Sequence, residues 1–456
     1  MTSAPPPLPD LDPVTKLSPY VTRILGQNPG KFTLQGTNSY LVHHPFSPSL
    51  LLIDTTGPSS SSPLAPSAVA SYTSHLVSAL AQHPAQPARV SDVVLTHWHG
   101  DHVRALAHTL EALAGRDDGT VEGGQGKAAP PRVWKMPCAV DDGKGVWASE
   151  RGKDAEIEHE LEGAVREGWV VPAAAEKEAG DGQPRAVRPL VDGQRFSLGG
   201  ESRSPSVGDG SRDGPVELEV VHTPGHTSDS VCLVLRRSDP SPSSSSASSH
   251  DVAPSPPLAL LTADTILGHG SSVFGSLSAY MSSLAALSAL LPSSSPTSSS
   301  SLDADERATA LKVPLYPGHG APCDDAASKV AEYRRHREER EAQVVEALEA
   351  RAKEDGEAIS AGDLTSLIYP PSLPPALHPA ATHSLLQHLG KLHDEGRVER
   401  VSSSAPDEAG EAVRKAPEGW FDGWRWVGER VGEAGTGRVD EASWEGQGGD
   451  EAAGRL

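Results

Sequence analysis

The sequence has few cysteines, few aromatic residues and a deficit of positive charge. Its 3 cysteines include no Cys-x-x-Cys pair, which excludes a disulfide-stapled scaffold and a cysteine-based zinc ribbon. It contains no run of 18 apolar residues, so we expect no transmembrane helix. Lysine and arginine total 39 against 61 acidic residues, and this net charge of -22 argues against a broad basic face for duplex DNA. We therefore expect neither a membrane nor duplex DNA among the partners.

The length and the loop-forming residues set the scale of the fold. A chain of 456 residues has room for two to three domains, but 44 glycines and 40 prolines indicate much unpacked loop. The first 16 residues are rich in proline and acids, unlike a secretory signal or an arginine-rich transit peptide. We interpret residues 1–16 as a disordered lead-in and the chain as cytoplasmic, with a mitochondrial location left open.

Low-complexity tracts interrupt the first two thirds of the chain. Such segments bury too little apolar surface to offset the entropy lost on ordering them. Each separates two apolar segments, so we interpret them as insertions in one domain over residues 17–328; they lie at about 114–129, 200–215, 238–257 and 292–304. Between them, strand-like runs alternate with helical patterns, which predicts an α+β sandwich of sheets with outer helices. The strands are expected at 39–42, 50–53, 93–95, 216–221, 231–235 and 258–261, and helices at 67–82 and 103–114.

Helical patterns dominate from about residue 326. They cover 326–353, 361–368 and 377–395, the last with a stripe of leucines, and two strand-like runs follow at 397–401 and 423–427. Three helices followed by a two-stranded wing predict a small winged-helix domain at 329–428. Residues 429–456 are acidic, and we expect a disordered tail there.

The strongest chemical signal is the motif His97-Trp98-His99-Gly100-Asp101-His102, which directly follows the apolar strand 93–95. Three histidines and one aspartate within six residues of a tight turn can converge on metal. Neutral imidazole suits zinc, and carboxylate oxygen completes such a coordination shell. A chance cluster of four ligand-type residues at this position is a poor alternative.

Three further segments place ligand-type residues after strands. Each is a weak signal by itself, because a lone histidine or aspartate at a strand end more often caps the strand or faces solvent. His226 lies in a Thr-Pro-Gly-His-Thr turn, Asp264 follows the strand 258–261, and His319 lies between two glycines. Together with the first motif they supply seven ligands for a two-metal site.

This series of motifs resembles the metallo-β-lactamase superfamily. The segments 28–30 and 34–42 and the stretch 264–280 are similar to one branch of it, the β-lactamase-like proteins with a C-terminal winged helix. That branch includes the animal mitochondrial endoribonuclease and fungal thioesterases that release polyketides from carrier proteins. The resemblance covers residues 17–430 and implies an αββα sandwich followed by the winged helix.

The resemblance also implies roles for the seven residues. One zinc ion takes His97, His99 and His226; the second takes Asp101, His102 and His319; and Asp264 bridges the two ions. Two zinc ions per chain would lower the pKa of a shared water, and the metal-bridging hydroxide would attack a carbonyl or phosphoryl centre. Asp101 and Asp264 are then the catalytic carboxylates, with Asp101 orienting the hydroxide.

Other residues have weaker claims. His269, between two glycines after Asp264, and Asn38 are candidate substrate-binding residues, although an ordinary loop histidine is the better interpretation of His269. Arginines at 334, 335, 337 and 340 form a basic cluster interleaved with glutamates. That cluster is either a solvated helix face with i,i+4 ion pairs, which we favour, or the phosphate-binding edge of an RNA channel.

The motifs leave the substrate open between two hydrolytic reactions. A single-stranded RNA endonuclease leads, because the similarity over the whole length is strongest to that group; the net charge and the 4% aromatic content weigh against it. The alternative is hydrolysis of an acyl thioester on coenzyme A or an acyl carrier protein, which would then be a partner. A pseudo-enzyme whose winged helix scaffolds a partner is a third hypothesis, disfavoured by seven intact ligand positions.

Overall fold

The computed structural model divides the chain into two units, Met1–Gln343 and Val344–Leu456, and each is described by itself. Most residues of the four expected insertions, and the whole tail 429–456, lie outside the residues that the structure describes. The described residues are 8–57, 66–116, 129–139, 147–173, 185–199, 214–238, 255–292, 312–354, 356–374, 378–401 and 423–428.

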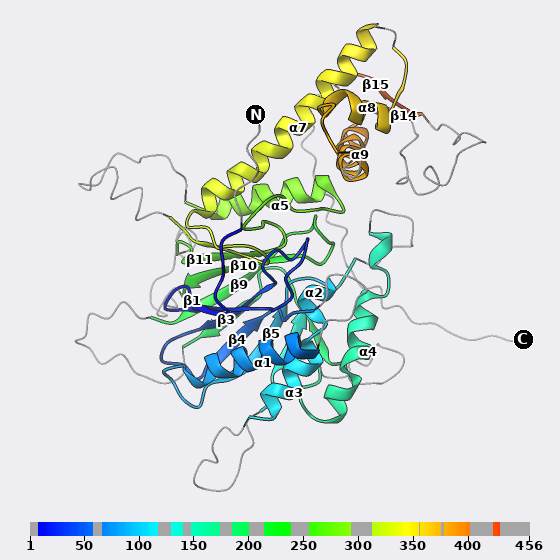
Figure 1. Ribbon diagram of the computed structural model, residues 1–456. Helices are drawn as coiled ribbons and strands as arrows, with labels where there is room; N and C mark the ends of the chain where they lie inside the picture. Colours follow the sequence, from blue (N-terminus) through cyan, green and yellow to red (C-terminus); the bar gives the residue numbers. More distant parts are fainter. Residues whose placement is uncertain are drawn as a thin grey trace, which may run out of the picture. The chain divides into compact units, whose positions relative to one another are not determined.

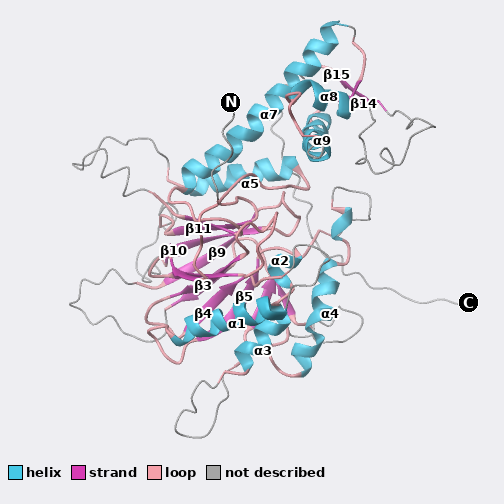
Figure 2. Cartoon of the chain, in the orientation of Figure 1, coloured by secondary structure: helices cyan, strands magenta, loops and turns pink. Residues whose placement is uncertain are grey.

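The first unit contains two β-sheets that face each other (Figures 1 and 2). The first sheet has seven strands in sequence order; neighbouring strands are antiparallel from β1 to β4 and parallel from β4 to β7. Its strands are β1 (Val14–Lys16), β2 (Val21–Leu25), β3 (Asn38–His43), β4 (Ser49–Ile53), β5 (Arg89–Leu95), β6 (Arg132–Lys135) and β7 (Val187–Pro189). The strand β1 corrects the expectation that all of residues 1–16 are a disordered lead-in, because Val14 pairs with Ile24 of β2.

The second sheet has five strands in the order β12-β11-β10-β9-β8. Only the pair β11 and β12 is parallel, and the others are antiparallel. Its strands are β8 (Arg195–Leu198), β9 (Val216–His222), β10 (Val231–Arg237), β11 (Ala259–Ala263) and β12 (Leu315–Pro317).

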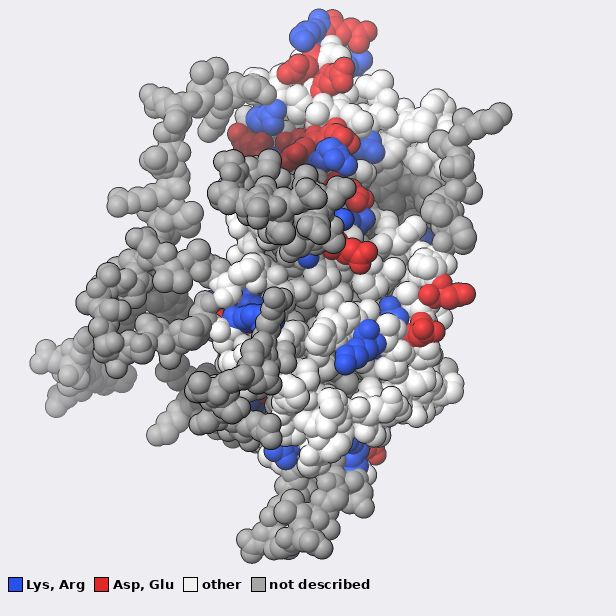
Figure 3. Space-filling view, turned by 90° about the vertical axis from the view of Figure 1, so that its left-hand side faces the viewer, with Lys and Arg blue, Asp and Glu red and all other residues white. Residues whose placement is uncertain are grey.

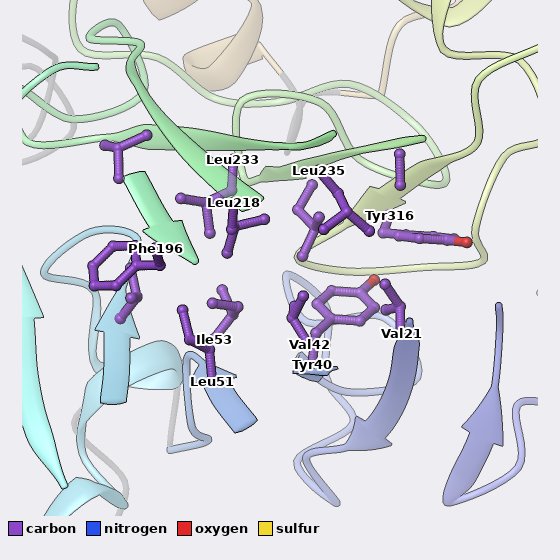
Figure 4. Close-up of a cluster of buried hydrophobic side chains, with 14 of the residues drawn as sticks. Val21, Tyr40, Val42, Leu51, Ile53, Phe196, Leu218, Leu233, Leu235 and Tyr316 are labelled. Carbon is purple, nitrogen blue, oxygen red and sulfur yellow. The ribbon is translucent and has the colours of Figure 1, made fainter. Parts of the chain in front are cut away.

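Alternating side chains of the strands explain where the core lies. In β4, Leu51 and Ile53 point into the space between the sheets, whereas Leu50 and Leu52 pack on the outer helices. Burial on both faces accounts for the unbroken apolar run of that strand. Figure 4 shows the inner cluster, in which Tyr40 faces Tyr316 of the opposite sheet at a ring distance of 5.8 Å. Each fully buried side chain of this kind contributes about 1.5–3 kcal/mol to folding.

Helices cover the outer faces of both sheets and complete the predicted αββα sandwich (Figure 1). The helices α1, α3 and α4 pack on the first sheet, and α5 and the first half of α7 pack on the second. Their bounds are α1 (Pro66–Ala81), α2 (Gly100–Val103), α3 (Leu106–Ala114), the 3-10 helix η1 (Ala148–Glu150), α4 (Lys153–Arg166), α5 (Leu277–Leu290) and α7 (Ala326–Glu354). None of the described helices is both long and apolar enough to cross a bilayer.

The second unit has the helices and wing expected of a winged-helix domain. Helix α7 continues into it, and α8 (Ala361–Ile368) and α9 (His378–Asp394) follow. Of the predicted leucine stripe, Leu385, Leu389 and Leu392 are fully buried beside Trp424. The small sheet has the order β13-β15-β14, with β13 (Ile359–Ser360), β14 (Val398–Val401) and β15 (Gly423–Trp426). Strand β13, only two residues long, is too short to be predicted from a pattern.

Candidate metal centre

Loops that follow β5, β9, β11 and β12 bring the seven predicted ligands together. The segment after β5 runs through Thr96 into the short helix α2, which holds Asp101 and His102 on one turn. The hydrogen bond from the Val231 amide to the Thr96 carbonyl joins the first loop to the opposite sheet. Loops at strand ends can carry function because the rigid sheets behind them fix their positions. The seven residues are His97, His99, Asp101, His102, His226, Asp264 and His319.

The first group consists of three imidazoles. His97 Nε2 lies 3.0 Å from His99 Nδ1, which lies 2.9 Å from His226 Nε2. The ring planes of His99 and His226 are 77° apart, so the rings meet edge to face instead of stacking. Three ring nitrogens that converge in this way form a donor set suited to one metal ion.

The second group combines a carboxylate with two imidazoles. His319 Nε2 lies 3.1 Å from Asp101 Oδ2 and 3.3 Å from His102 Nε2. The helix turn of α2 therefore faces the turn after β12, although more than 200 residues separate them in the sequence. This mixed set of nitrogen and oxygen can also hold a divalent ion.

Asp264 lies between the two groups. Its Oδ1 is 3.4 Å from His102 Nε2, and its Oδ2 is 3.4 Å from His319 Nε2 and 3.7 Å from His226 Nε2. Its carboxylate thus faces histidines of both groups, the position that the resemblance assigns to a bridging ligand.

Hydrogen bonds on the far side of the rings orient the ligand nitrogens. His226 Nδ1 lies 2.6 Å from the Val273 carbonyl, and His102 Nδ1 lies 2.8 Å from Asp54 Oδ2. These oxygens only accept, so each Nδ1 carries the proton and each Nε2 presents its lone pair to the centre. Ring nitrogens that face one another in this way fit metal ions, because a metal ion accepts a lone pair from each neutral ring.

The electrostatics of the two groups differ. Burial, with the nearby His226, lowers the pKa of His99 to about 3, and burial likewise lowers the pKa of His97 well below its ordinary value. Both imidazoles are therefore neutral, as metal ligands must be. Burial also acts against charge on His102, but Asp264, Asp54 and Asp101 outweigh it and raise the pKa of His102 well above its ordinary value. The acidic group attracts positive charge, and metal binding there would displace a proton.

Asp54 is a functional residue that the sequence analysis missed. It directly follows β4, is 2% exposed, and has a φ of 57°. Its Oδ1 accepts the Thr96 amide at 2.7 Å, while its Oδ2 accepts Thr96 Oγ1 at 2.7 Å and His102 Nδ1 at 2.8 Å. Thr96 Oγ1 in turn lies 3.0 Å from His97 Nδ1. The Asp54 carboxylate therefore orients one histidine of each group. In the sequence, its position directly after an apolar strand indicates such a role.

The two expected substrate residues both lie beside the turn that carries His319. Asn38 is 1% exposed, and its Nδ2 donates to the carbonyls of Pro317 and Gly320 at 2.9 and 2.8 Å. The buried amide of Asn38 holds the turn that carries His319, and a substrate contact of Asn38 stays a prediction. His269 is half-buried beside that turn, after Gly268, whose amide donates to the His319 carbonyl. A substrate role for His269 stays a prediction.

The basic cluster on α7 is divided between the surface and the interior. Arg334 and Arg335 face Glu338 and Glu339 at 3.4 and 3.7 Å, the i,i+4 pairs that we favoured. Arg337 is only 6% exposed and belongs to the interior. On the face drawn in Figure 3, acidic and basic side chains of the described residues lie beside one another without a broad basic field.

Comparison with known proteins agrees with this geometry. Residues 32–114 match the metallo-beta-lactamase superfamily, and residues 360–407 match the beta-lactamase associated winged helix domain. A "Beta-lactamase-like protein 2 homolog" of Caenorhabditis elegans is 31% identical over 86% of this chain and 91% of its own length. An "Atrochrysone carboxyl ACP thioesterase" of Passalora fulva is 26% identical over 91% of this chain and 84% of its own length. The chain belongs to the metallo-β-lactamase superfamily of metal-dependent hydrolases.

Proposed function

We propose that this hydrolase cleaves phosphodiester bonds of single-stranded RNA with water activated at a centre for two zinc ions. The observation that supports hydrolysis is the convergence of seven ligand-type side chains in two groups, with Asp264 facing both. When bound, zinc ions lower the pKa of water for attack and neutralise the charge that develops on the substrate oxygens. Side chains of the protein orient the attacking water and hold the ligands in place.

The two carboxylates are more exposed than the two histidines of the second group. The side chains of Asp101 and Asp264 are 11% and 12% exposed, whereas those of His102 and His319 are 0% and 2% exposed. Burial raises the pKa of Asp101, but His102 and His319 outweigh it and lower that pKa below its ordinary value. Asp101 is therefore ionised at neutral pH and can orient the attacking water by accepting its hydrogen bond. Asp264 holds the histidines of the two groups at fixed spacing.

RNA is the first substrate in this proposal because of the branch to which the motifs point. The resemblance is to a branch that includes an endoribonuclease, and the β-lactamase-like relatives from Caenorhabditis elegans and Drosophila melanogaster are 31% and 27% identical to this chain. A single strand also needs less positive surface than a duplex, which suits the mixed charges of the described surface.

A labelled single-stranded RNA tests the proposal directly. We expect cleavage by the zinc-loaded protein, loss of cleavage on chelation, recovery when zinc is restored, and a loss of at least 100-fold in Asp101→Asn. A duplex DNA of the same sequence should stay intact. If the protein binds two zinc ions and leaves the RNA uncut, RNA cleavage is refuted.

A second substrate is favoured by two observations. The relative from Passalora fulva is named as a thioesterase of an acyl carrier protein, and Arg334 and Arg335 already face glutamates instead of standing ready for phosphates. Hydrolysis of an acyl thioester on coenzyme A or on a carrier protein would use the same centre. Release of free thiol by the zinc-loaded protein, absent in Asp101→Asn, together with intact RNA would establish this second function.

A further inference from the structure

One face of helix α7 packs against the loop 265–276, which connects β11 to α5. The guanidinium of Arg337 donates hydrogen bonds to Ser271 Oγ and, at 3.1 Å, to the Ser272 carbonyl. The same guanidinium lies 4.7 Å from the ring centre of Phe274. Arg337 thus contacts three residues of the loop, Ser271, Ser272 and Phe274, from the interior of the first unit.

Tyr333, one helical turn before Arg337, contacts the other half of the loop. Its hydroxyl accepts the Leu267 amide at 3.1 Å and lies 3.0 Å from the Gly270 carbonyl. Residues four apart lie on the same side of a helix, so both side chains point toward the loop. Together they connect the loop to α7 along most of its length.

The loop in turn bonds to three of the seven proposed ligands. These bonds hold the ring of His226 and the backbone at Asp264 and His319, so a displaced loop would displace ligands from both metal groups. They run from His226 Nδ1 to the Val273 carbonyl at 2.6 Å, from the Gly268 amide to the His319 carbonyl at 2.9 Å, and from Ser272 Oγ to the Asp264 carbonyl.

We propose that Arg337 is a positioning residue for the metal centre, acting through the loop 265–276. It bonds to the carbonyl of Ser272, whose hydroxyl bonds to the Asp264 carbonyl, and the next residue, Val273, accepts from His226. This inference rests on the proposed metal-dependent function and adds a determinant of metal affinity that lies outside the ligand set.

The chemistry of arginine explains why this position needs more than a positive charge. A planar guanidinium stacks on an aromatic ring with its face and donates in two directions from its edge. Lysine keeps the charge but has no plane to stack on Phe274, and its side chain is one atom too short to reach the position of Nη2, which makes both bonds. Arg337→Lys therefore tests the geometry of the contact separately from its charge.

The experiment compares Arg337→Lys with Arg335→Lys in the full chain. Arg335 is a matched control, because it lies on the same helix, is exposed, and faces Glu339. Zinc affinity is measured by competition with a chromogenic chelator, and melting is followed with and without excess chelator. We expect Arg337→Lys to lose about 10- to 100-fold in zinc affinity, the usual effect of removing an outer partner of a metal ligand. Arg335→Lys should stay within twofold of the wild type.

The melting data separate positioning from a merely structural role. Positioning predicts that zinc raises the melting temperature of Arg337→Lys less than that of the wild type. A structural role would lower the melting temperature equally with and without zinc, and that result, or unchanged zinc affinity, overturns the inference. If Arg337→Lys does not fold, Ser272→Ala, which removes the hydroxyl that bonds to the carbonyls of Asp264 and Val273, must weaken zinc binding for the inference to stand.

The readouts also keep this inference distinct from the proposed function. Zinc binding is measured without substrate, so failure to cleave RNA or thioester refutes the proposed reaction and leaves the role of Arg337 intact. A wild-type protein that binds no zinc refutes both. Normal catalysis with equal zinc affinity in all variants refutes the role of Arg337 alone.

Discussion

Replacing Asp54 by asparagine should weaken the metal centre without altering any ligand. Three donors converge on its two oxygens: the Thr96 amide on Oδ1, and Thr96 Oγ1 and His102 Nδ1 on Oδ2. Asparagine has a single side-chain oxygen, and the Thr96 amide keeps its hydrogen bond to that oxygen. Its amide nitrogen then takes the place of Oδ2 and points its hydrogens at two groups that need an acceptor.

The consequence for His102 follows from its two nitrogens. To accept from the new amide, Nδ1 must lose its proton, and the ring of a neutral His102 then carries its proton on Nε2. That atom faces Asp264 at 3.4 Å, so the lone pair offered to the metal is lost. Changes of this kind cost 10- to 100-fold in metal affinity, or about 1.4–2.7 kcal/mol. Each lost bond to the carboxylate costs a further ~1.5–3 kcal/mol of folding stability.

A chelator competition for zinc and urea unfolding measure the two effects, with Asp92→Asn as the control. Asp92 is similarly buried, at 3% exposed, and lies in the neighbouring strand β5, but it binds Arg132 and Trp134. Asp92→Asn should lose stability and keep zinc affinity. Wild-type zinc affinity in Asp54→Asn, or an equal loss in Asp92→Asn, would refute the reasoning.

Three further predictions concern the rest of the first unit. Leu233→Ala opens a cavity between the sheets and should cost about 2–5 kcal/mol in urea unfolding with unchanged zinc stoichiometry; a cost under ~1 kcal/mol would contradict the packing. Gly225→Ala should lower both the melting temperature and zinc affinity, since its β-carbon would lie 2.5 Å from Tyr280 Cα; wild-type melting would contradict this. Burial and the nearby His83 lower the pKa of His43 to about 3. Between about pH 6.5 and 3, His43 therefore binds a proton in the unfolded chain but not in the folded chain. The free energy of unfolding falls as the pH falls, by about 1.4 kcal/mol per pH unit. His43→Gln should flatten that slope between pH 6 and 4, and parallel slopes would exclude the effect.

The convergence of the seven candidate ligands could be predicted because they lie in turns that follow strands. A strand appears in the sequence as a short apolar run, and the residues after it lie at the edge of the sheet. His97 and Asp264 could therefore be recognised as candidate ligands at strand ends. The fold followed from the same runs: β4, β9, β10 and β11 lie where the patterns placed them. By contrast, β7 is three residues long with no fully buried residue and gives no such pattern.

Contacts between distant turns could not be predicted in this way. Asn38 sits in a segment that the family resemblance marks, but no local pattern shows that its amide binds carbonyls 279 and 282 residues away. A polar residue near a site is equally compatible with holding a turn and with touching substrate. Only the three-dimensional arrangement shows that the Asn38 amide holds the turn of His319.

The charge of Arg337 and its spacing along the helix predict different positions for this residue. Considered by charge alone, it belongs with Arg334 and Arg335 in a basic cluster. Considered by spacing, it follows Val330 and Tyr333 at intervals of three and four, the repeat of a buried helix stripe. Both of those residues are under 5% exposed, and Arg337 continues their stripe at 6%. A charged residue in a core position requires a partner inside the fold, so the period of the helix already predicts an internal role for this arginine.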